Sequence, residues 1–269
     1  MINAIIQWVA RKFGYVVVLE KIHELPDAGY EGSKIDYLYL DRISELVDKF
    51  SHFTPQNFFE VGANFAQDAT YLAKKWALEP DAVFVFEPHP EIAARVSSHY
   101  DFRVFPIAIS NVNDWLTFNA VNLDETSNSG ISSLLQHSVN GASASNEIKV
   151  QVSRLDAIIS SEHIESIDFL KIDVEGLAYE VLEGLGDSIN RVACIQVETE
   201  YIPIWEGQRL QADVYGLLEA KGFQLIEHEL QMDGVQADSL WIRCDLVEHK
   251  IYDIGRQQWI VEKSSRDSL

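Results

Sequence analysis

The chain has 269 residues, of which 47% are hydrophobic and 11% aromatic, so it can bury a sizeable core and is not globally disordered. Lys and Arg number 21 against 42 Asp and Glu, which gives a net charge of −21. An acidic surface repels phosphate backbones and anionic lipid headgroups, which argues against nucleic acid or an anionic membrane surface as a partner.

The first 50 residues are predicted to form a helical extension. Arg11 and Lys12 interrupt the apolar N-terminus, and no run approaches the ~20 apolar residues of a spanning helix, so we predict no transmembrane segment. Apolar residues from Ile2 to Phe13 can line one helix face that packs on the body of the protein or on a second subunit of a homo-oligomer. With no secretory signal pattern, and with Cys194 and Cys244 predicted to be buried reduced thiols, a cytoplasmic location is expected.

Strands and helices alternate along the main domain, which we place at residues 51–249, followed by a C-terminal tail at 250–269. The predicted strands are 57–61, 82–87, 102–107, 167–173, 192–197, 223–227 and 239–243, and the predicted helices are 67–76, 90–100, 178–185 and 210–221. The alternation predicts βαβ units, and the continuous apolar strands predict a sheet covered on both faces. The last two strands have no helix between them and should pair antiparallel at one edge. The predicted fold is therefore α/β, a Rossmann-like, seven-stranded, doubly wound sheet.

An insertion at about 111–153 interrupts this alternation. It contains two strand-like runs, 117–121 and 148–152, around a Ser- and Asn-rich stretch. Its place after the third strand puts it near the carboxyl ends of the sheet, where ligands bind in such folds. We interpret it as a lid or substrate loop, with a merely flexible connection as the alternative.

The turn after the first strand, EVGAN at 60–64, is the first candidate binding feature. Gly62 lets the backbone turn tightly and approach a ligand, and the Glu60 carboxylate can accept hydrogen bonds from a cationic amine. The later glycines of a GxGxxG dinucleotide motif are absent, and an acidic side chain there would repel a pyrophosphate. The second strand ends at Glu87, where a carboxylate can bind ribose hydroxyls. Together these features predict a site for a nucleoside that carries an ammonium group.

Carboxylates also end the next two strands, with Asp173 and Glu175 after the fourth and Glu198 on the fifth. Grouped at the ligand-binding edge, they can hold a hydroxyl substrate, act as a general base, or bind a divalent metal through oxygen. The structural alternative is a set of solvated strand ends, for which Lys171 is an available partner. His137, in the predicted lid, is a further candidate base because histidine titrates near neutral pH.

Six short motifs support a family assignment: EVGAN at 60–64, FEPHP at 86–90, AIS at 108–110, GISSLL at 130–135, RLD at 154–156 and FLKIDVEG at 169–176. This set resembles the FkbM family of methyltransferases over about residues 58–243. The family usually has Asp where this chain has Glu60. The resemblance implies a class I methyltransferase fold, S-adenosylmethionine as methyl donor, and O-methylation of a hydroxyl on a sugar, glycan or natural product. It also implies a donor pocket formed by Glu60, Val61, Gly62, Ala63, Asn64, Glu87, Pro88, Ser110 and Asp173.

Three other functions remain open to the sequence. In a metal-assisted O-methyltransferase, Asp173 and Glu198 would hold Mg²⁺, which would acidify the substrate hydroxyl; without that mechanism we predict no metal. A non-catalytic binding module could keep the same fold, although the acidic donor-site residues argue against it. An NAD-dependent dehydrogenase is disfavoured by the missing glycines.

Overall fold

The computed structural model describes residues 37–51, 53–125, 128–138, 145–231, 234–247, 249–253 and 258–262. The chain divides into two units, residues 1–31 and 32–269, and all described residues belong to the second. The amphipathic helix predicted near the N-terminus lies outside the described residues. No described helix has the length and apolar character needed to cross a membrane.

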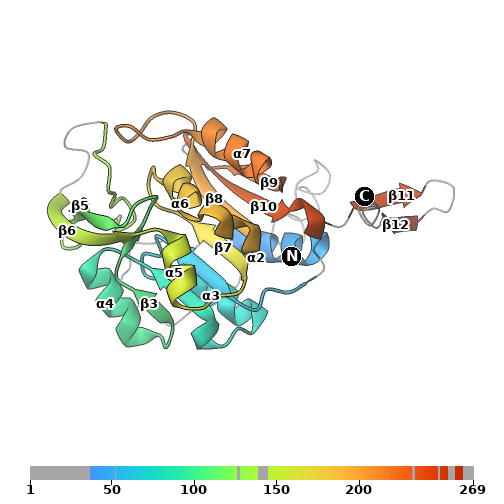
Figure 1. Ribbon diagram of the computed structural model, residues 1–269, viewed down its shortest axis with the longest axis horizontal. Helices are drawn as coiled ribbons and strands as arrows, with labels where there is room; N and C mark the ends of the chain where they lie inside the picture. The colour runs from blue at the N-terminus through green and yellow to red at the C-terminus, as the bar shows by residue number, and fades with distance from the viewer. Residues whose placement is uncertain are drawn as a thin grey trace, which may run out of the picture. The chain divides into compact units, whose positions relative to one another are not determined.

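A seven-stranded sheet with the order β3-β2-β1-β7-β8-β10-β9 forms the centre of the fold (Figure 1). Its strands are β1 (Phe58–Val61), β2 (Val83–Phe86), β3 (Arg103–Phe105), β7 (Ile167–Ile172), β8 (Val192–Glu200), β9 (Phe223–Leu230) and β10 (Gln236–Arg243). The first five pair in parallel, and β10 is antiparallel to both β8 and β9. The strand order reverses between β1 and β7, and the predicted doubly wound, Rossmann-like α/β fold is confirmed.

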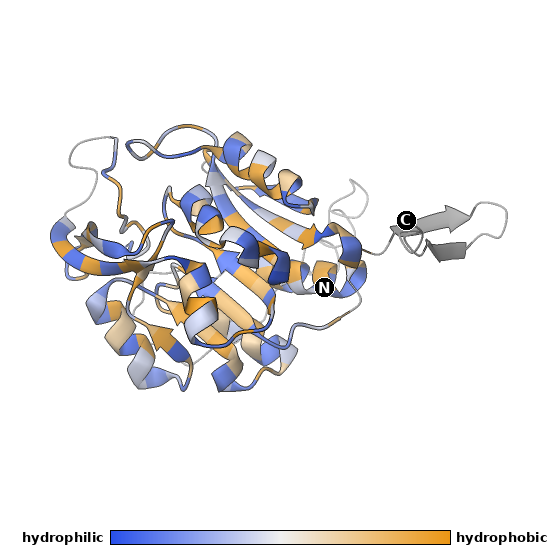
Figure 2. Cartoon of the chain, in the orientation of Figure 1, coloured by the Kyte–Doolittle hydropathy of each residue, from blue (hydrophilic) through white to orange (hydrophobic). Residues whose placement is uncertain are grey.

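Helices cover both faces of this sheet. They are α2 (Tyr37–Phe50), α3 (Gln67–Trp76), α4 (Pro90–His99), α5 (Leu155–Ser161), α6 (Ala178–Gly184) and α7 (Gln211–Ala220), with short 3₁₀ turns at Pro80–Ala82, Gly186–Arg191 and Cys244–Leu246. Apolar residues of α5, α6 and α7 share one core with alternate residues of the strands. On the opposite face, the Trp76 ring lies 6.2 Å from the Phe58 ring and 5.0 Å from the Phe169 ring, centroid to centroid. Among the residues that the structure describes, hydrophobic residues are concentrated in the central strands (Figure 2).

Most predicted elements occur, with ends shifted by one to three residues. One difference that concerns the site is at β8, which was predicted to end at Val197 and continues to Glu200. It continues because β10 pairs with it up to the register Gln236–Glu200, so the edge partner provides hydrogen bonds beyond the apolar run. Cys194 is buried as predicted, but the burial predicted for Cys244 is wrong: it is exposed, because β10 ends at Arg243 and a 3₁₀ turn begins there.

The insertion contains a second, three-stranded sheet with the order β4-β6-β5. Its strands are β4 (Ala108–Ile109), β5 (Asp114–Val121) and β6 (Ser145–Ser153), and β5 and β6 are antiparallel. Phe118, Val150 and Val152 form its small apolar core. Both strand-like runs of the insertion are therefore ordered strands, and they position residues 128–138 between them. Near the C-terminus, β11 (His249–Asp253) and β12 (Gln258–Glu262) form an antiparallel hairpin.

Candidate functional site

A cavity of about 560 Å³ lies at the carboxyl ends of the parallel strands. Residues that end or follow β1, β2, β7 and β8 line it, together with residues 128–134 of the insertion and with Gln231 and Gln236 near the β9–β10 turn. The reversal of strand order between β1 and β7 places the cavity there, since the connections on either side run in opposite directions and leave a crevice.

The turn after β1 joins three strands. Gly62 N–H and Ala63 N–H both donate to the Phe86 carbonyl of β2, at 3.0 and 3.2 Å. Gly62 has a φ of +78°, and a Cβ at this position would lie 1.7 Å from the Asp173 carbonyl oxygen after β7. Only glycine fits this conformation and this close approach. The backbone of the turn is therefore held against both neighbouring strands at the base of the cavity.

Glu87 is fixed by backbone donors. One carboxylate oxygen accepts from Asn64 N–H at 2.8 Å, and the other accepts from His89 N–H at 2.7 Å. Burial raises the pKa of Glu87 to about 7, although these two N–H donors favour the ionised form. The carboxylate lines the cavity in a defined orientation and keeps lone pairs for a ligand that donates hydrogen bonds.

Lys171 is a buried cation shared by three carboxylates. Its Nζ lies 2.7 Å from Asp68, 3.1 Å from Asp173 and 3.5 Å from Glu60. Burial alone would lower the pKa of Lys171, but these carboxylates raise it well above its ordinary value. Glu60 also accepts from Ala69 N–H at 3.1 Å, near the start of α3. Of the three carboxylates, Asp173 is the one that lines the cavity. It therefore presents to the cavity a negative charge that already forms an ion pair with Lys171.

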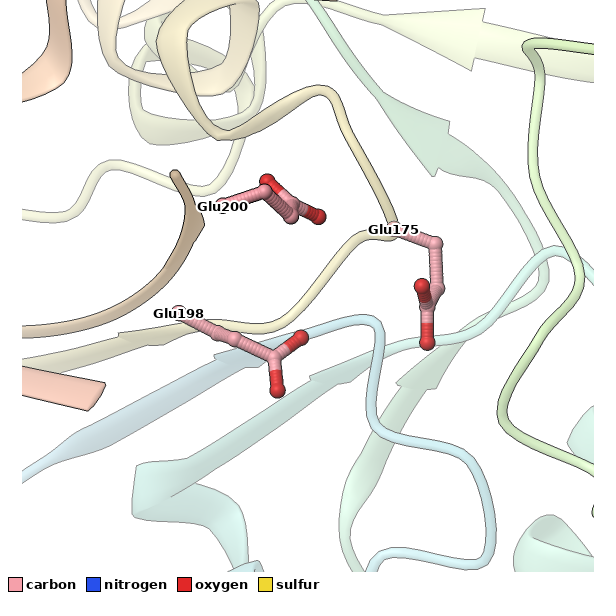
Figure 3. Close-up of side chains that lie close together, drawn as sticks. All are labelled: Glu175, Glu198 and Glu200. Atoms are coloured by element: carbon pink, nitrogen blue, oxygen red, sulfur yellow. The ribbon is translucent and has the colours of Figure 1, made fainter. Parts of the chain in front are cut away.

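Glu175, Glu198 and Glu200 form a second group of carboxylates, whose oxygens approach within 4.8 Å of one another. Figure 3 shows Glu198 and Glu200 on β8 and Glu175 on the loop after β7, with their carboxyl groups facing a common space. Burial, followed by the neighbouring carboxylates, raises the pKa of Glu175 and of Glu198 well above ordinary values, and burial raises that of Glu200 to about 7. Gln231 Nε2 donates to Glu198 at 2.6 Å. Burial and mutual repulsion therefore oppose simultaneous ionisation of the three carboxyl groups.

Residues 128–134 of the insertion line the cavity, and the segment 128–138 is attached on both sides. The side chains of Ser129 and Asn64 exchange two hydrogen bonds, of 2.9 and 3.0 Å, and the Ser133 hydroxyl donates to the Glu175 carbonyl at 2.7 Å. Farther along, Ser138 N–H donates to the Ile204 carbonyl at 2.8 Å. The segment is therefore a wall of the cavity in this conformation.

Eight of the predicted site residues line the cavity: Val61, Gly62, Asn64, Glu87, Pro88, Asp173, Glu175 and Glu198. Four others do not. The Glu60 side chain is directed to Lys171 and α3, and Ala63 is buried in the turn after β1. Ser110 packs closely against Gly184, where an added Cβ atom would lie 2.2 Å from the Ser110 carbonyl oxygen. The His137 ring lies against Trp205, with 5.1 Å between centroids, and His137 is not among the lining residues.

The charged side chains that line the cavity are all acidic in the part of the chain that the structure describes. Its lining includes the carboxyl groups of Glu87, Asp173, Glu175 and Glu198 and, among the residues that the structure describes, no Lys, Arg or His. The lining also includes the apolar side chains of Ile107, Ile109 and Phe118. Such a wall suits a ligand that combines a flat apolar group with positive charge, and it repels phosphates.

Comparison with known proteins decides the family. The model of the methyltransferase FkbM domain matches residues 60–225, which is more than half of the chain. The chain belongs to the FkbM methyltransferase family. The class I methyltransferase fold expected from the sequence is thereby confirmed together with the sheet order.

Three individual proteins illustrate what the chain is similar to. The chain is 28% identical over 193 residues to the 2-O-methyltransferase NoeI of Sinorhizobium fredii, a match that covers 67% of this chain and 76% of that protein. A solved FkbM methyltransferase from Methylobacillus flagellatus is 14% identical with a TM-score of 0.45, and the match covers 70% of this chain but only 44% of the solved one. Magnesium protoporphyrin IX methyltransferase of Synechocystis, solved with bound SAM, is 10% identical with a TM-score of 0.42, over 78% of this chain and 86% of that chain.

Sequence reasoning missed one acidic residue of this FkbM methyltransferase and two amides. Glu200 belongs to the second carboxylate group, and Gln231 and Gln236 line the cavity. Glu200 could have been predicted from the sequence. Residues two apart on a strand share a face, so Glu200 lies on the same face as Glu198 if the predicted strand is extended to residue 200. Gln231 and Gln236 lie outside the predicted strands 223–227 and 239–243, because β9 extends to Leu230 and β10 begins at Gln236.

The ligand-free enzyme is expected to lose stability as pH rises. Folded-state pKa values are raised to about 7 for Glu87 and Glu200 and to about 6 for Asp238. Such groups stabilise the folded protein below their unfolded pKa values, and this contribution is lost as pH rises through the folded values. A carboxyl group shifted from 4.5 to about 7 corresponds to roughly 3 kcal/mol. Urea unfolding at pH 5 and pH 8 should give the lower free energy at pH 8; equal or higher stability at pH 8 would contradict the raised values.

Proposed function

We propose that this FkbM methyltransferase takes the methyl group of S-adenosylmethionine and transfers it to a hydroxyl oxygen of a sugar, a glycan or another hydroxylated natural product. Glu87 carries the proposal. Its carboxylate lies at the end of β2, lines the cavity and is oriented by two backbone N–H groups. Ribose hydroxyls are donors that such a fixed, buried acceptor can bind.

The rest of the wall fits the same ligand. The apolar lining residues Ile107, Ile109 and Phe118 suit an adenine ring. Asp173, paired with Lys171 from behind, offers a fixed negative charge to an ammonium group. A dinucleotide pyrophosphate would meet several carboxylates and no basic side chain among the described lining residues. The wall therefore favours a nucleoside with positive charge over NAD.

The chain's own residues have three tasks in the proposed reaction. S-adenosylmethionine, when bound, supplies an electrophilic methyl group on a sulfonium. Gly62, Asn64, Glu87, Pro88 and Val61 bind and orient the nucleoside part. The wall of residues 128–134 limits access of water. Glu175 and Glu198 are the candidate bases for the acceptor's hydroxyl proton, whereas Asp173 is already engaged with Lys171. His137, which contacts Trp205, is not assigned a role in this scheme.

A hydroxyl acceptor is supported by two observations. NoeI, the relative that matches 67% of this chain, is a 2-O-methyltransferase. In addition, Ser132, Gln231 and Gln236 are among the residues that line the cavity, and Gln231 contacts Glu198; hydroxyl and amide groups bind neutral hydroxyls well.

A metal-assisted reaction is the second candidate, because the oxygens of Glu175, Glu198 and Glu200 lie within 4.8 Å of one another and are of the type that hard cations prefer. Here a divalent ion would acidify the acceptor hydroxyl. Activity that survives exhaustive EDTA treatment would exclude this candidate.

The deciding experiment is transfer of labelled methyl from S-adenosylmethionine to a panel of neutral sugars, oligosaccharides and other hydroxylated acceptors. We expect label in at least one O-methylated product, and calorimetry should show binding of S-adenosylhomocysteine but not of NAD. Absence of donor binding at millimolar ligand would refute the proposal and favour a non-catalytic module on this fold.

A further inference from the structure

Trp205 contacts two other segments that surround the cavity. It belongs to the loop after β8, yet its side chain is only 3% exposed. It packs on Gly176, where an added Cβ atom would lie 2.5 Å from Trp205 Cδ1, and it lies near the Glu175 carboxyl group. The His137 ring packs edge-on against it. The loop after β7, the insertion and the loop after β8 therefore meet at one buried indole.

The backbone of the insertion is attached to the same loop. His137 and Trp205 form an isolated antiparallel bridge, which we call the 137–205 bridge. Two backbone hydrogen bonds of 2.8 Å flank it, from Ser138 N–H to the Ile204 carbonyl and from Glu206 N–H to the Gln136 carbonyl. Because these bonds lie on either side of the pair, the 137–205 bridge is of the non-hydrogen-bonded type, in which the two Cα atoms approach to about 4.5 Å.

Both partners of the 137–205 bridge are held in place by further contacts. On the side of β8, the Gln208 side-chain oxygen accepts from Ile204 N–H and Trp205 N–H. On the side of the insertion, the Ser133 hydroxyl donates to the Glu175 carbonyl at 2.7 Å. The insertion is thus attached to the loop after β7 directly and to the loop after β8 through the bridge.

We propose that Trp205 is a positioning residue that, through the 137–205 bridge, holds the insertion and Glu175 in the arrangement that methyl transfer to the acceptor requires. The proposal rests on the proposed function for its chemistry, whereas the attachment of the three segments does not. Trp205 is not among the lining residues, so it acts through Ser133, Leu134 and Glu175, which are. A displacement of about 1 Å at a reacting group can cost about 100-fold in rate, so a small shift of this wall is sufficient.

The first test separates positioning from general stability. Trp205→Ala should lower kcat by about 100-fold and leave the affinity for S-adenosylhomocysteine unchanged, because Glu87 is fixed by Asn64 N–H and His89 N–H. Trp205→Phe, which keeps a ring against Gly176, should recover most of the lost kcat. Wild-type kcat in Trp205→Ala, or a parallel loss of donor affinity, would overturn the proposal.

Trp76→Ala is the matched control, since this buried tryptophan packs on Phe58 and Phe169 on the opposite face of the sheet. It should lower the free energy of unfolding and leave kcat unchanged. An equal fall in kcat in Trp76→Ala would show that loss of any buried tryptophan has this effect, and the special role of Trp205 would be wrong.

A disulfide tests the 137–205 bridge itself. Non-hydrogen-bonded pairs have Cα separations within the range of about 4.4 to 6.8 Å that disulfides span. The His137→Cys/Trp205→Cys protein also carries Cys244→Ser, because Cys244 is exposed. When reduced, it should be as slow as Trp205→Ala, and oxidation should raise kcat because it closes the bridge covalently. An oxidised protein that is no faster than the reduced one would overturn the proposal.

Hydrogen exchange of residues 128–138 gives a readout that needs no activity. Protection of this segment should fall in Trp205→Ala and return on oxidation of the double-cysteine protein, whatever the enzyme methylates. Unchanged protection in Trp205→Ala would contradict the attachment through Trp205. Failure of the wild-type protein to bind S-adenosylhomocysteine would refute the proposed function separately, without altering the exchange result.

Discussion

Alanine in place of Glu87 is expected to weaken binding of S-adenosylhomocysteine by at least about 100-fold. Hydrogen bonds to a charged acceptor contribute about 1.5–3 kcal/mol each, and a ribose can offer two. The variant also removes the acceptor of Asn64 N–H and His89 N–H, so the turn after β1 loses a support. Isothermal titration calorimetry at pH 8, above the Glu87 pKa of about 7, measures the effect with the carboxylate ionised.

Two variants make this result specific. Glu87→Gln keeps one acceptor oxygen and should lie between wild type and Glu87→Ala in affinity. Glu91→Ala removes an exposed carboxylate from the first turn of α4 and should bind like wild type. If Glu87→Ala retains wild-type affinity while it remains folded, the ribose does not bind at the end of β2 and the donor pocket is misplaced.

Gly62→Ala is expected to destabilise the protein by more than about 4 kcal/mol, a size that marks disruption of a special backbone position. The added Cβ would lie 1.7 Å from the Asp173 carbonyl oxygen and 2.7 Å from its carbonyl carbon. These are backbone atoms of the neighbouring strand end, which cannot rotate away. The hydrogen bond from Asp173 N–H to the Val61 carbonyl, 2.9 Å long, would have to break or lengthen. Urea denaturation measures the loss.

Gly207→Ala is the matched control for the backbone conformation. Gly207 has a φ of +77°, almost that of Gly62, but nothing lies within 4 Å of its Cβ position. Its substitution should therefore cost only the left-handed conformation, about 1–2 kcal/mol. The difference between the two variants in free energy of unfolding measures the effect of the close approach between the end of β7 and the turn. Similar losses at the two glycines would mean that the close approach does not constrain the site.

The local features of this enzyme follow from the sequence because each depends on residues near in the chain. Apolar runs predict β1, β2 and β7, since a strand buried on both faces is mostly apolar. The positions of the turn at Gly62 and of Glu87 at the end of β2 can be predicted from the sequence, because each directly follows an apolar strand. The loop-like insertion was identified with its two strands, because their composition is typical of β-structure.

Tertiary structure alone decided how the carboxylates are shared. Glu60 and Lys171 are neighbours only because β1 and β7 pair in register, although 111 positions separate them in the chain. That pairing removes Glu60 from the cavity and leaves Asp173 as its visible anion. Glu200 joins Glu198 because β10 pairs with the last residues of β8. Electrostatic roles depend on distances between side chains from remote segments, and these distances exist only after the sheet has formed.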